Sequence, residues 1–489
     1  MLGRITQWTQ QADASTPQVM TPDYDMEDQL LDATIAPQGG AVSKAFSYQY
    51  DGAGNRTLEQ IDSAGTSFSA TAAAYNNVNQ LTARSPGPVL FKGTINEPGT
   101  VTVNGQAAKM TQDPNSGSNG KIFTTSVPLS AGQNTVPIVA MALTGLTPPV
   151  TTTKTYNLTV IDPGSRTYSY DANGNRTNYT AVTPLSGVQV TYEFDAEDRL
   201  VAVNTNAPSA PALRSEFTYD GFSRWVKIVE KNNGTVTSTK QFIWCGKQLC
   251  EERDGNNNVT KRFYAEGEQI GETSYYFTKD HLGNIREMTG PRGAILARYD
   301  YDPYGRRTKV SGTMDADFGF TGHYYHAPSG LHLALYRAYD ADTGRWPNHD
   351  PIGERGGINL YGYVGNNPIN RIDPLGLFVN VENPIVNPQG PWAWQVGTSP
   401  EYTPSASDVA VTFGIYAAGA AAITGIGALI EAYGASVLGW LGLAGTAAES
   451  PQGQRAIQCV QSTAANLAQL MMDGKSAQAL NQIHSHPPA

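Results

Sequence analysis

A tyrosine-rich phrase recurs along the chain and limits the folds open to it more than any other feature. It reads YQYDGAGNRT from Tyr48 and YSYDANGNRT from Tyr168, and looser copies begin at Tyr24 and Tyr192. In both halves the spacing is 24 residues, and a fixed period of this length indicates a repeat architecture. Each copy predicts two strands joined by a turn, in which Gly174 takes a positive φ. Because one hairpin cannot bury its own face, we expect the copies to stack into a continuous sheet.

Composition supports a mainly β chain with several domains. The 489 residues include 50 glycines, 30 prolines and 25 tyrosines, and only 16% of the residues are charged. Aromatic side chains fit a pleated sheet, whereas glycine and proline form its corners. The net charge of −10 disfavours nucleic acid as a partner, because phosphate binding needs a basic surface.

The three cysteines, Cys245, Cys250 and Cys459, are too few for a disulfide framework. We expect Cys245 and Cys250 to be free thiols on a twisted strand. A disulfide between them is the less favoured alternative.

Residues 86–163 interrupt the repeats and follow a different pattern. Short strand-like stretches, such as 100–103 and 154–160, are separated by turn signals that include Asn104 and Gly105. This pattern is typical of a small β-sandwich, and we predict an immunoglobulin-like insert. A disordered insertion is the alternative. Since the period is the same on both sides, we expect the flanking residues to form one sheet, with the insert outside it.

The YDxxGNRT phrases and the stretch 276–377 resemble the Rhs/YD-repeat family, which is related to teneurins and to the C components of toxin complexes. The resemblance is strongest over 276–377, which begins YFTKDHLGNIREM and ends INRIDPLGL. It implies a β-strip wound into a hollow shell, a core that plugs one end, and a variable C-terminal segment, often a toxin, held inside. On this basis we divide the chain into repeats at 1–85 and 164–275 and a core at 276–377. Because only a few repeats are present, we expect an incomplete shell.

The same resemblance implies a self-cleavage site at the end of the core. Family members cut their own chain after a DPxGL motif, which here places the scissile bond between Leu377 and Phe378. Asp350 and Asp373 match the family's two carboxylates, and Arg337 matches the arginine that accompanies them. Two carboxylates held close together cannot both ionise, so one can draw a proton from water while the other donates a proton to the peptide carbonyl. The arginine is expected to orient a carboxylate or polarise that carbonyl.

Two observations leave the self-cleavage open. Asp-Pro is a common start of a turn, so Asp350 and Asp373 could simply cap turns. The family commonly has an arginine where this chain has His349. This replacement would make a neighbouring charge depend on pH, and the cleavage could be slower or pH-dependent.

No other motif predicts enzymatic turnover. The sequence has no phosphate-binding loop of the Walker type and no dinucleotide-binding glycine pattern, so we expect no cofactor. The histidines of GHYYHAPSGLH, which are His323, His326 and His332, are interpreted as core residues rather than metal ligands.

The chain changes character after the core. Residues 378–408 are rich in proline and predict a linker. Residues 409–489 predict a variable, partly helical region, whose first part, 409–447, is uncharged except for Glu431. The run before Glu431 is long enough to span a membrane, and its small residues recur four apart, as in packed membrane hairpins. A soluble helix kept dry inside the shell is the alternative.

Together these features predict a secreted or cell-surface shell protein that encloses or presents a C-terminal effector and releases it by self-cleavage after Leu377. Its partners would be its own C-terminal segment as cargo, an immunity protein or export machinery, and a membrane contacted through 409–447. No signal peptide is visible, so we expect another export route or a chain that is a piece of a longer protein. The alternative is a non-catalytic adhesion protein that binds partners through its repeats and its insert.

Overall fold

The computed structural model describes residues 4–111, 121–142, 151–183, 187–208 and 210–377. In this part the chain is mainly β, as the sequence predicted. All described residues belong to one compact unit. The predicted linker at 378–408 and the predicted helical region at 409–489 lie outside the described residues.

The repeat strands fall into two groups on either side of the insert. Before it lie β1 (Trp8–Gln10), β2 (Gln18–Tyr24), β3 (Leu30–Pro37), β4 (Lys44–Tyr50), β5 (Arg56–Ser63), β6 (Ser67–Tyr75) and β7 (Leu81–Pro86). After it lie β15 (Ser165–Tyr170), β16 (Arg176–Thr183), β17 (Gln189–Phe194), β18 (Leu200–Asn206), β19 (Leu213–Tyr219), β20 (Trp225–Asn232), β21 (Thr235–Cys245), β22 (Gln248–Arg253), β23 (Val259–Tyr264), β24 (Gly267–Ile270), β25 (Thr273–Lys279), β26 (Ile285–Thr289), β27 (Ile295–Tyr301) and β28 (Arg307–Gly312).

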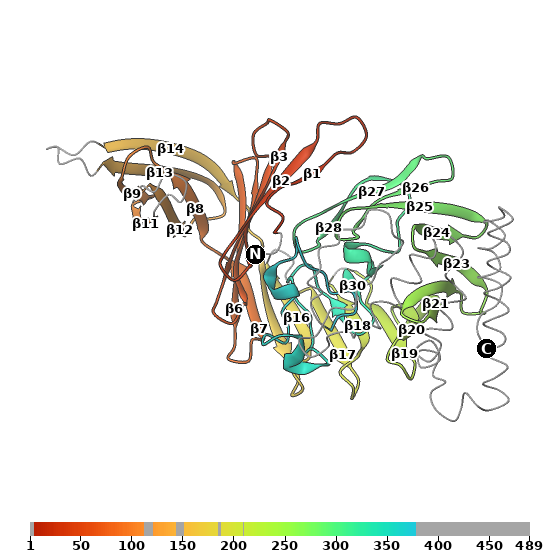
Figure 1. The fold of residues 1–489 in the computed structure, drawn as a ribbon. Coiled ribbons are helices and arrows are strands. Elements are labelled where there is room, and N and C mark those ends of the chain that lie inside the picture. Colours follow the sequence, from red (N-terminus) through yellow and green to blue (C-terminus); the bar gives the residue numbers. More distant parts are fainter. Residues whose placement is uncertain (1–3, 112–120, 143–150, 184–186, 209, 378–489) are drawn as a thin grey trace, which may run out of the picture. The chain divides into compact units, whose positions relative to one another are not determined.

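These strands form one antiparallel strip, in which each strand pairs with the next repeat strand along the chain (Figure 1). The strip continues past the insert because β7 pairs directly with β15. Ala83 lies opposite Thr167, and Arg84 lies opposite Arg166. The expectation of one sheet on both sides of the insert is therefore confirmed.

The turn of each repeat is held by the aspartate of its tyrosine-aspartate phrase. Asp51 Oδ1 accepts hydrogen bonds from the backbone N–H groups of Ala53, at 3.0 Å, and Asn55, at 2.8 Å. Asp51 Oδ2 also accepts a bond from the Asn55 side chain at 2.9 Å. Asp171 makes the same three contacts in its own turn. The glycine before the asparagine has a positive φ, +85° at Gly174, as the turn pattern predicted.

Side chains of consecutive turns also bind one another along the edge of the strip. Asn55 donates its side-chain N–H to Asn79 Oδ1 at 2.8 Å. Asn175 does the same to Asp198 Oδ1 at 2.7 Å. The first pair is 24 residues apart and the second 23 residues apart. The sequence period is therefore the distance along the chain from one turn to the next on the same edge.

The part of the core that follows β28 packs against one face of the strip (Figure 1). Its regular elements are η1 (Phe320–Gly322), β29 (Tyr324–His326), β30 (Leu331–Leu333), β31 (Ala338–Tyr339), η2 (Gly353–Gly356) and η3 (Val364–Asn366). The Trp225 ring of β20 packs at a tilt against Tyr324, with ring centroids 5.2 Å apart, and its indole N–H donates to the Ala334 carbonyl at 3.0 Å. Aromatic contacts of this kind contribute roughly 1 kcal/mol each beyond their buried area, so they hold the core in place.

The insert consists of two small sheets that share an apolar core. Its strands are β8 (Val89–Thr94), β9 (Gly99–Val103), β10 (Gln106–Ala107), β11 (Lys109–Thr111), β12 (Ile122–Val127), β13 (Gly132–Ala142) and β14 (Thr151–Val160). Strands β8, β12 and β11 form one sheet, whereas β14, β13, β9 and β10 form the other. Val103, Phe123 and Leu158 belong to the shared core. A short parallel pairing of β14 with β6 joins the insert to the strip, and its immunoglobulin-like classification stays a prediction.

Cys245 and Cys250 are joined by a disulfide, so the expectation of two free thiols is wrong. Strands β21 and β22 pair Trp244 with Leu249 and then skip Cys250, which is the extra residue of a β-bulge. The bulge places the Cα atoms of the two cysteines 5.8 Å apart, within the range of a disulfide. The spacing in the sequence could not indicate this pairing because it does not show where the bulge lies.

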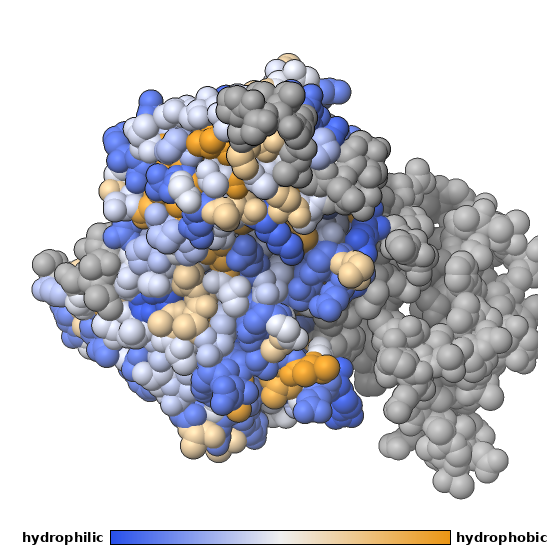
Figure 2. Space-filling model, turned by 90° about the vertical axis from the view of Figure 1, so that its left-hand side faces the viewer, coloured by the Kyte–Doolittle hydropathy of each residue, from blue (hydrophilic) through white to orange (hydrophobic). Residues whose placement is uncertain are grey.

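Within the described part of the chain, no helix is long and apolar enough to cross a membrane. The predicted membrane segment at 409–447 lies outside the described residues. Figure 2 shows the face that carries the insert, where small groups of apolar side chains are scattered among polar ones.

The turn at Gly174 generates a stability prediction. A Cβ at this position would overlap the His349 ring and would lie 2.9 Å from the Tyr361 hydroxyl, and the backbone φ is unfavourable for alanine. We expect Gly174→Ala to lower the free energy of unfolding by about 1–3 kcal/mol in urea denaturation. Gly221→Ala is the matched control, because a Cβ there meets nothing within 4 Å. Equal effects of the two substitutions would contradict this explanation.

Candidate functional site

The three residues of the predicted site come together in the core. Arg337 precedes β31, Asp350 precedes η2, and Asp373 follows η3. All three are buried, with exposed fractions of 5%, 8% and 3%. Buried charged groups are rare unless they are paired, so each of these three side chains needs a charged or hydrogen-bonding partner.

Arg337 lies between the two aspartates. Its Nη2 atom donates to Asp350 Oδ2 at 2.7 Å and lies 3.5 Å from Asp373 Oδ2. One guanidinium nitrogen therefore contacts one oxygen of each carboxylate. The sequence proposed this grouping, and the structure places the three side chains in contact.

Several other contacts fix the Arg337 side chain. Its Nε donates to the Gly376 carbonyl, and its Nη1 donates to the Leu360 carbonyl at 3.3 Å. The guanidinium carbon lies 4.4 Å from the centre of the Trp346 ring, in a cation–π contact. The arginine is thus held by backbone oxygens and an aromatic ring as well as by the two carboxylates.

The DPLGL segment wraps around its own aspartate. Asp373 Oδ1 accepts hydrogen bonds from the backbone N–H groups of Gly376, at 2.8 Å, and Leu377, at 3.0 Å. Gly376 has a φ of +75°, and a Cβ there would lie 3.1 Å from Arg337. Glycine is therefore required for both the turn and the close approach to the arginine. Phe378, on the other side of the predicted scissile bond, lies outside the described residues.

Gly356, at the end of η2, is a site residue that the sequence analysis missed. A Cβ at this position would overlap Asp350 Oδ2 and would lie 2.6 Å from the Leu377 carbonyl oxygen. These two oxygens therefore border the same small space beside the glycine. In the sequence, only the Gly356-Gly357 pair between the two aspartates could have indicated this close approach. Because pairs of glycines occur in many other contexts, the pair did not identify a site residue.

Burial shifts the pKa values of all three site residues. Burial raises the pKa of Asp373 to about 6, although Arg337 and two backbone N–H groups partly oppose the rise. Burial also raises the pKa of Asp350, again against the effect of Arg337. For Arg337, burial lowers the pKa more than the two carboxylates raise it. Asp373 therefore keeps a proton at a higher pH than an exposed aspartate does.

His323 binds the backbone carbonyl of Asp373, a contact with the site that the sequence did not predict. Its Nε2–H donates to the Asp373 carbonyl at 3.1 Å, and its Nδ1 accepts from the Thr321 hydroxyl at 3.1 Å. Burial lowers the pKa of His323 to about 4, so the ring is neutral at neutral pH. His326 instead contacts Glu230 at 2.8 Å, and no group of metal-binding residues forms in the part of the chain that the structure describes.

The contacts of His349 are with a repeat turn. Its ring lies 4.7 Å from the Tyr361 ring and next to Gly174. Burial lowers its pKa, although Asp198 and Asp171 partly oppose the change. A charge on His349 is therefore disfavoured at neutral pH.

In comparisons with known proteins, the chain matches a YD-shell family, a nuclease and two toxins. The Teneurin YD-shell family model matches residues 264–369. The tRNA3(Ser)-specific nuclease WapA of Bacillus spizizenii is 31% identical over 43% of this chain and 9% of its own length. The double-stranded DNA deaminase toxin A of Burkholderia cenocepacia is 27% identical over 43% of this chain and 17% of its length. The toxin protein Tse5 of Pseudomonas aeruginosa is 25% identical over 43% of this chain and 19% of its length.

The chain spans less than a fifth of the length of these curated relatives. Among solved structures, the crystal structure of TcdB2-TccC3 covers 74% of this chain and 19% of that chain, with 16% identity and a TM-score of 0.32.

The raised pKa of Asp373 predicts a pH-dependent stability. Between the ordinary value of 3.8 and about 6, the folded chain holds a proton that the unfolded chain has lost. Stability from this group is therefore complete at acid pH and is lost as the pH rises through about 6. We expect wild type to lose ~3 kcal/mol of unfolding free energy relative to Asp373→Asn between about pH 4 and pH 7. Urea denaturation at several pH values measures this difference, and a difference that is independent of pH would contradict the assignment.

Proposed function

We propose that this chain, a member of the Rhs/YD-repeat family, cleaves its own backbone between Leu377 and Phe378. The observation that carries the proposal is the position of the Leu377 carbonyl oxygen, which borders the same space as Asp350 Oδ2 beside Gly356. Arg337 links that carboxylate to Asp373. A peptide carbonyl beside one of two carboxylates that a shared arginine holds together supports acid–base hydrolysis.

The roles of the two aspartates follow from their contacts. Asp350 has the shorter contact with Arg337, 2.7 Å against 3.5 Å, which favours its ionised form. Asp373 is more buried and keeps its proton up to about pH 6. We therefore assign Asp350 as the base that takes a proton from water and Asp373 as the acid. Because the groups are coupled, the pair rather than either residue sets the observed pH dependence.

Hydrolysis then proceeds in two steps. The oxygen of water bonds to the Leu377 carbonyl carbon while Asp350 takes its proton and Asp373 protonates the carbonyl oxygen. The bond from that carbon to the Phe378 nitrogen then breaks, the nitrogen takes the proton from Asp350, and the hydroxyl proton returns to Asp373. Arg337 keeps both carboxylates in place throughout. The products are a new carboxyl group on Leu377 and a new amino group on Phe378.

The consequence of the cut is separation of the shell from the segment that follows. The relatives include a nuclease, a deaminase toxin and another toxin, which supports a toxin-type effector after residue 377. In this proposal the C-terminal segment is the cargo of a secreted or surface-exposed shell. An immunity protein and export machinery would be its partners, and residues 409–447 would contact a membrane.

A fragment that begins at Phe378 tests the cleavage. The full chain is expressed and denatured, and the N-terminus of each fragment is determined by mass spectrometry. Asp350→Asn and Asp373→Asn are each expected to slow cleavage about a hundredfold or more, because an amide cannot exchange the proton. Asp254→Asn is the matched control, since Asp254 caps a repeat turn through two backbone N–H groups.

The experiment distinguishes self-cleavage from a purely structural role of the two carboxylates. If the two core variants stay intact while Asp254→Asn is cut, the carboxylates act in the cleavage rather than only as turn caps. A wild-type chain that stays uncut from acid to neutral pH would contradict self-cleavage and favour the adhesion protein.

Gly356 provides an independent test of the geometry. We expect Gly356→Ala to slow cleavage about a hundredfold, because the new methyl group would displace Asp350 or the Leu377 carbonyl by a fraction of an ångström or more. Gly52→Ala is the control, since a Cβ at that turn meets nothing within 4 Å. The rate is followed by gel electrophoresis after the chain is refolded from an uncut, denatured form. Cleavage at the wild-type rate in a folded Gly356→Ala chain would show that the space beside this glycine does not matter.

A further inference from the structure

A cavity of about 210 Å³ lies where the insert leaves the strip. Ser69 and Thr71 of β6 line it, as do Pro163 and Gly164, which follow the last strand of the insert. We call it the root cavity. Its walls come from both sides of the insertion point, and the core contributes Asp342.

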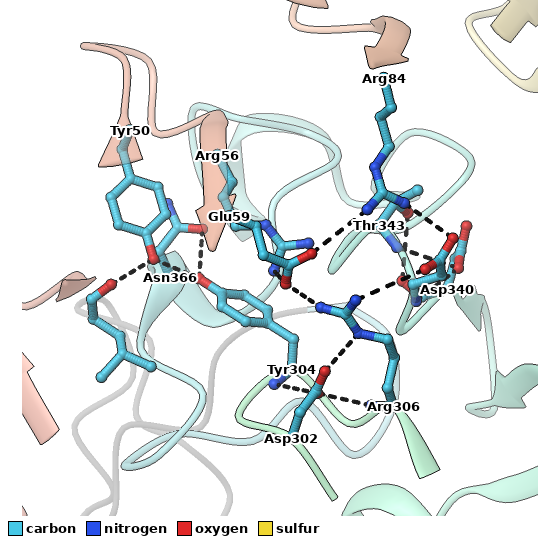
Figure 3. Close-up of polar contacts among 12 residues, drawn as sticks. Tyr50, Arg56, Glu59, Arg84, Asp302, Tyr304, Arg306, Asp340, Thr343 and Asn366 are labelled. Carbon is cyan, nitrogen blue, oxygen red and sulfur yellow. Dashed lines mark hydrogen bonds and ion pairs between the residues drawn. The ribbon is translucent and has the colours of Figure 1, made fainter. Parts of the chain in front are cut away.

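The charged residues that line the root cavity do not balance. Arg84, Arg166 and Arg306 carry three positive charges, whereas Glu59 and Asp342 carry two negative ones. Figure 3 shows Glu59, Arg84 and Arg306 turned toward one another. Outside the lining, Arg56 lies 3.5 Å from Glu59, and Asp302 binds Arg306. The charges of Arg56 and Asp302 cancel each other. One positive charge is left in excess.

Both carboxylates are ionised at neutral pH. Burial by itself raises the pKa of Glu59, but Arg306, Arg56 and Arg84 lower it further, and the net change is downward. Asp342 shows the same balance, with burial opposed by Arg84, Arg166 and Arg306. Because both carboxylates are ionised, the cavity keeps an excess of one positive charge at neutral pH.

The three arginines bring hydrogen-bond donors to the cavity. Arg84 donates to Asp342 at 3.0 Å, and Arg166 and Arg306 contact Asp342 and Glu59 respectively. Each guanidinium carries several N–H donors in a planar fork, so these contacts use only some of them. The Arg166 and Arg306 side chains are 31% and 26% exposed, which leaves them accessible from the cavity.

We propose that the root cavity binds a small oxyanion, with the chemistry shared by phosphate and carboxylate ligands. Such an anion would neutralise the excess charge, and the attraction between opposite charges is stronger in a partly enclosed cavity than in bulk water. Guanidinium groups bind the paired oxygens of these anions with two parallel hydrogen bonds. Ser69 and Thr71, which also line the cavity, carry hydroxyl groups that can donate further hydrogen bonds. The bound anion would bridge Arg166 of β15 and Arg306, which precedes β28, beside the root of the insert.

Isothermal titration calorimetry on the full chain tests this site and does not depend on self-cleavage. Inorganic phosphate and acetate are titrated separately at neutral pH, in chloride buffer of constant ionic strength. We expect saturable binding of one anion per chain, and the tighter probe identifies phosphate or carboxylate as the ligand class. Arg166→Gln is expected to weaken this binding about tenfold or more. Arg262→Gln is the matched control, because Arg262 also pairs with a carboxylate, Glu251 at 3.4 Å, outside the cavity.

A second variant separates anion binding from a purely structural ion cluster. Asp342→Asn removes a negative charge from the lining, so we expect phosphate to bind several-fold more tightly even though the lost ion pairs lower the thermal midpoint. A cluster that only joins the strip to the core would lose stability in this variant and would bind no phosphate. The proposal is overturned if wild type binds neither probe, or if Arg166→Gln binds them as wild type does.

Discussion

The hydrogen bond from a backbone N–H to the side chain of a preceding aspartate is the interaction on which this structure depends. Asp51 and Asp171 use it to fix the turns of their repeats, and Asp350 and Asp373 use it in the core. Each such bond contributes only about 1 kcal/mol to stability. Its importance is geometric: repetition at the hairpins places the turns on one edge, where neighbouring turns bind one another.

In the core, the same interaction leaves one carboxylate oxygen available for other contacts. Oδ1 of Asp350 caps the turn at Ile352 at 3.0 Å, whereas its Oδ2 contacts Arg337. Asp373 divides its oxygens in the same way, with Oδ1 bound to its own turn and Oδ2 facing Arg337. Each aspartate can therefore cap its own turn and also belong to a pair of carboxylates. The capped turn also carries Leu377 back toward the carboxylates.

Buried arginines are the second organising feature, because they connect the strip to the core across long stretches of sequence. Arg345 donates to Asn55 at 2.8 Å and lies over the Tyr75 ring at 4.7 Å. Arg84 of the strip pairs with Asp342 of the core. Only 16% of the residues are charged, yet many of the charges lie at these internal contacts. The excess charge of the root cavity belongs to this set of arginines.

The resemblance to the Rhs/YD-repeat family identified Arg337, Asp350 and Asp373 as candidates. The sequence itself determined what depends on neighbouring residues: the strands, the turns with their aspartate and glycine, and the 24-residue period. These follow from hydrogen bonds that span a few residues and from alternation along a strand. The shared period also indicated correctly that the residues on both sides of the insert form one sheet, which the pairing of β7 with β15 makes continuous.

Only the tertiary structure decided which distant groups meet. It placed His349 against a repeat turn, Gly356 between Asp350 and Leu377, and His323 behind Asp373. It also formed the disulfide at Cys250, which depends on a bulge, and the root cavity, whose walls come from the strip, the insert and the core. Such contacts depend on how the strip curves around the core and on where its registers shift. No local pattern of residues carries that information, because most of these contacts join segments far apart in the chain and the disulfide depends on the position of a bulge.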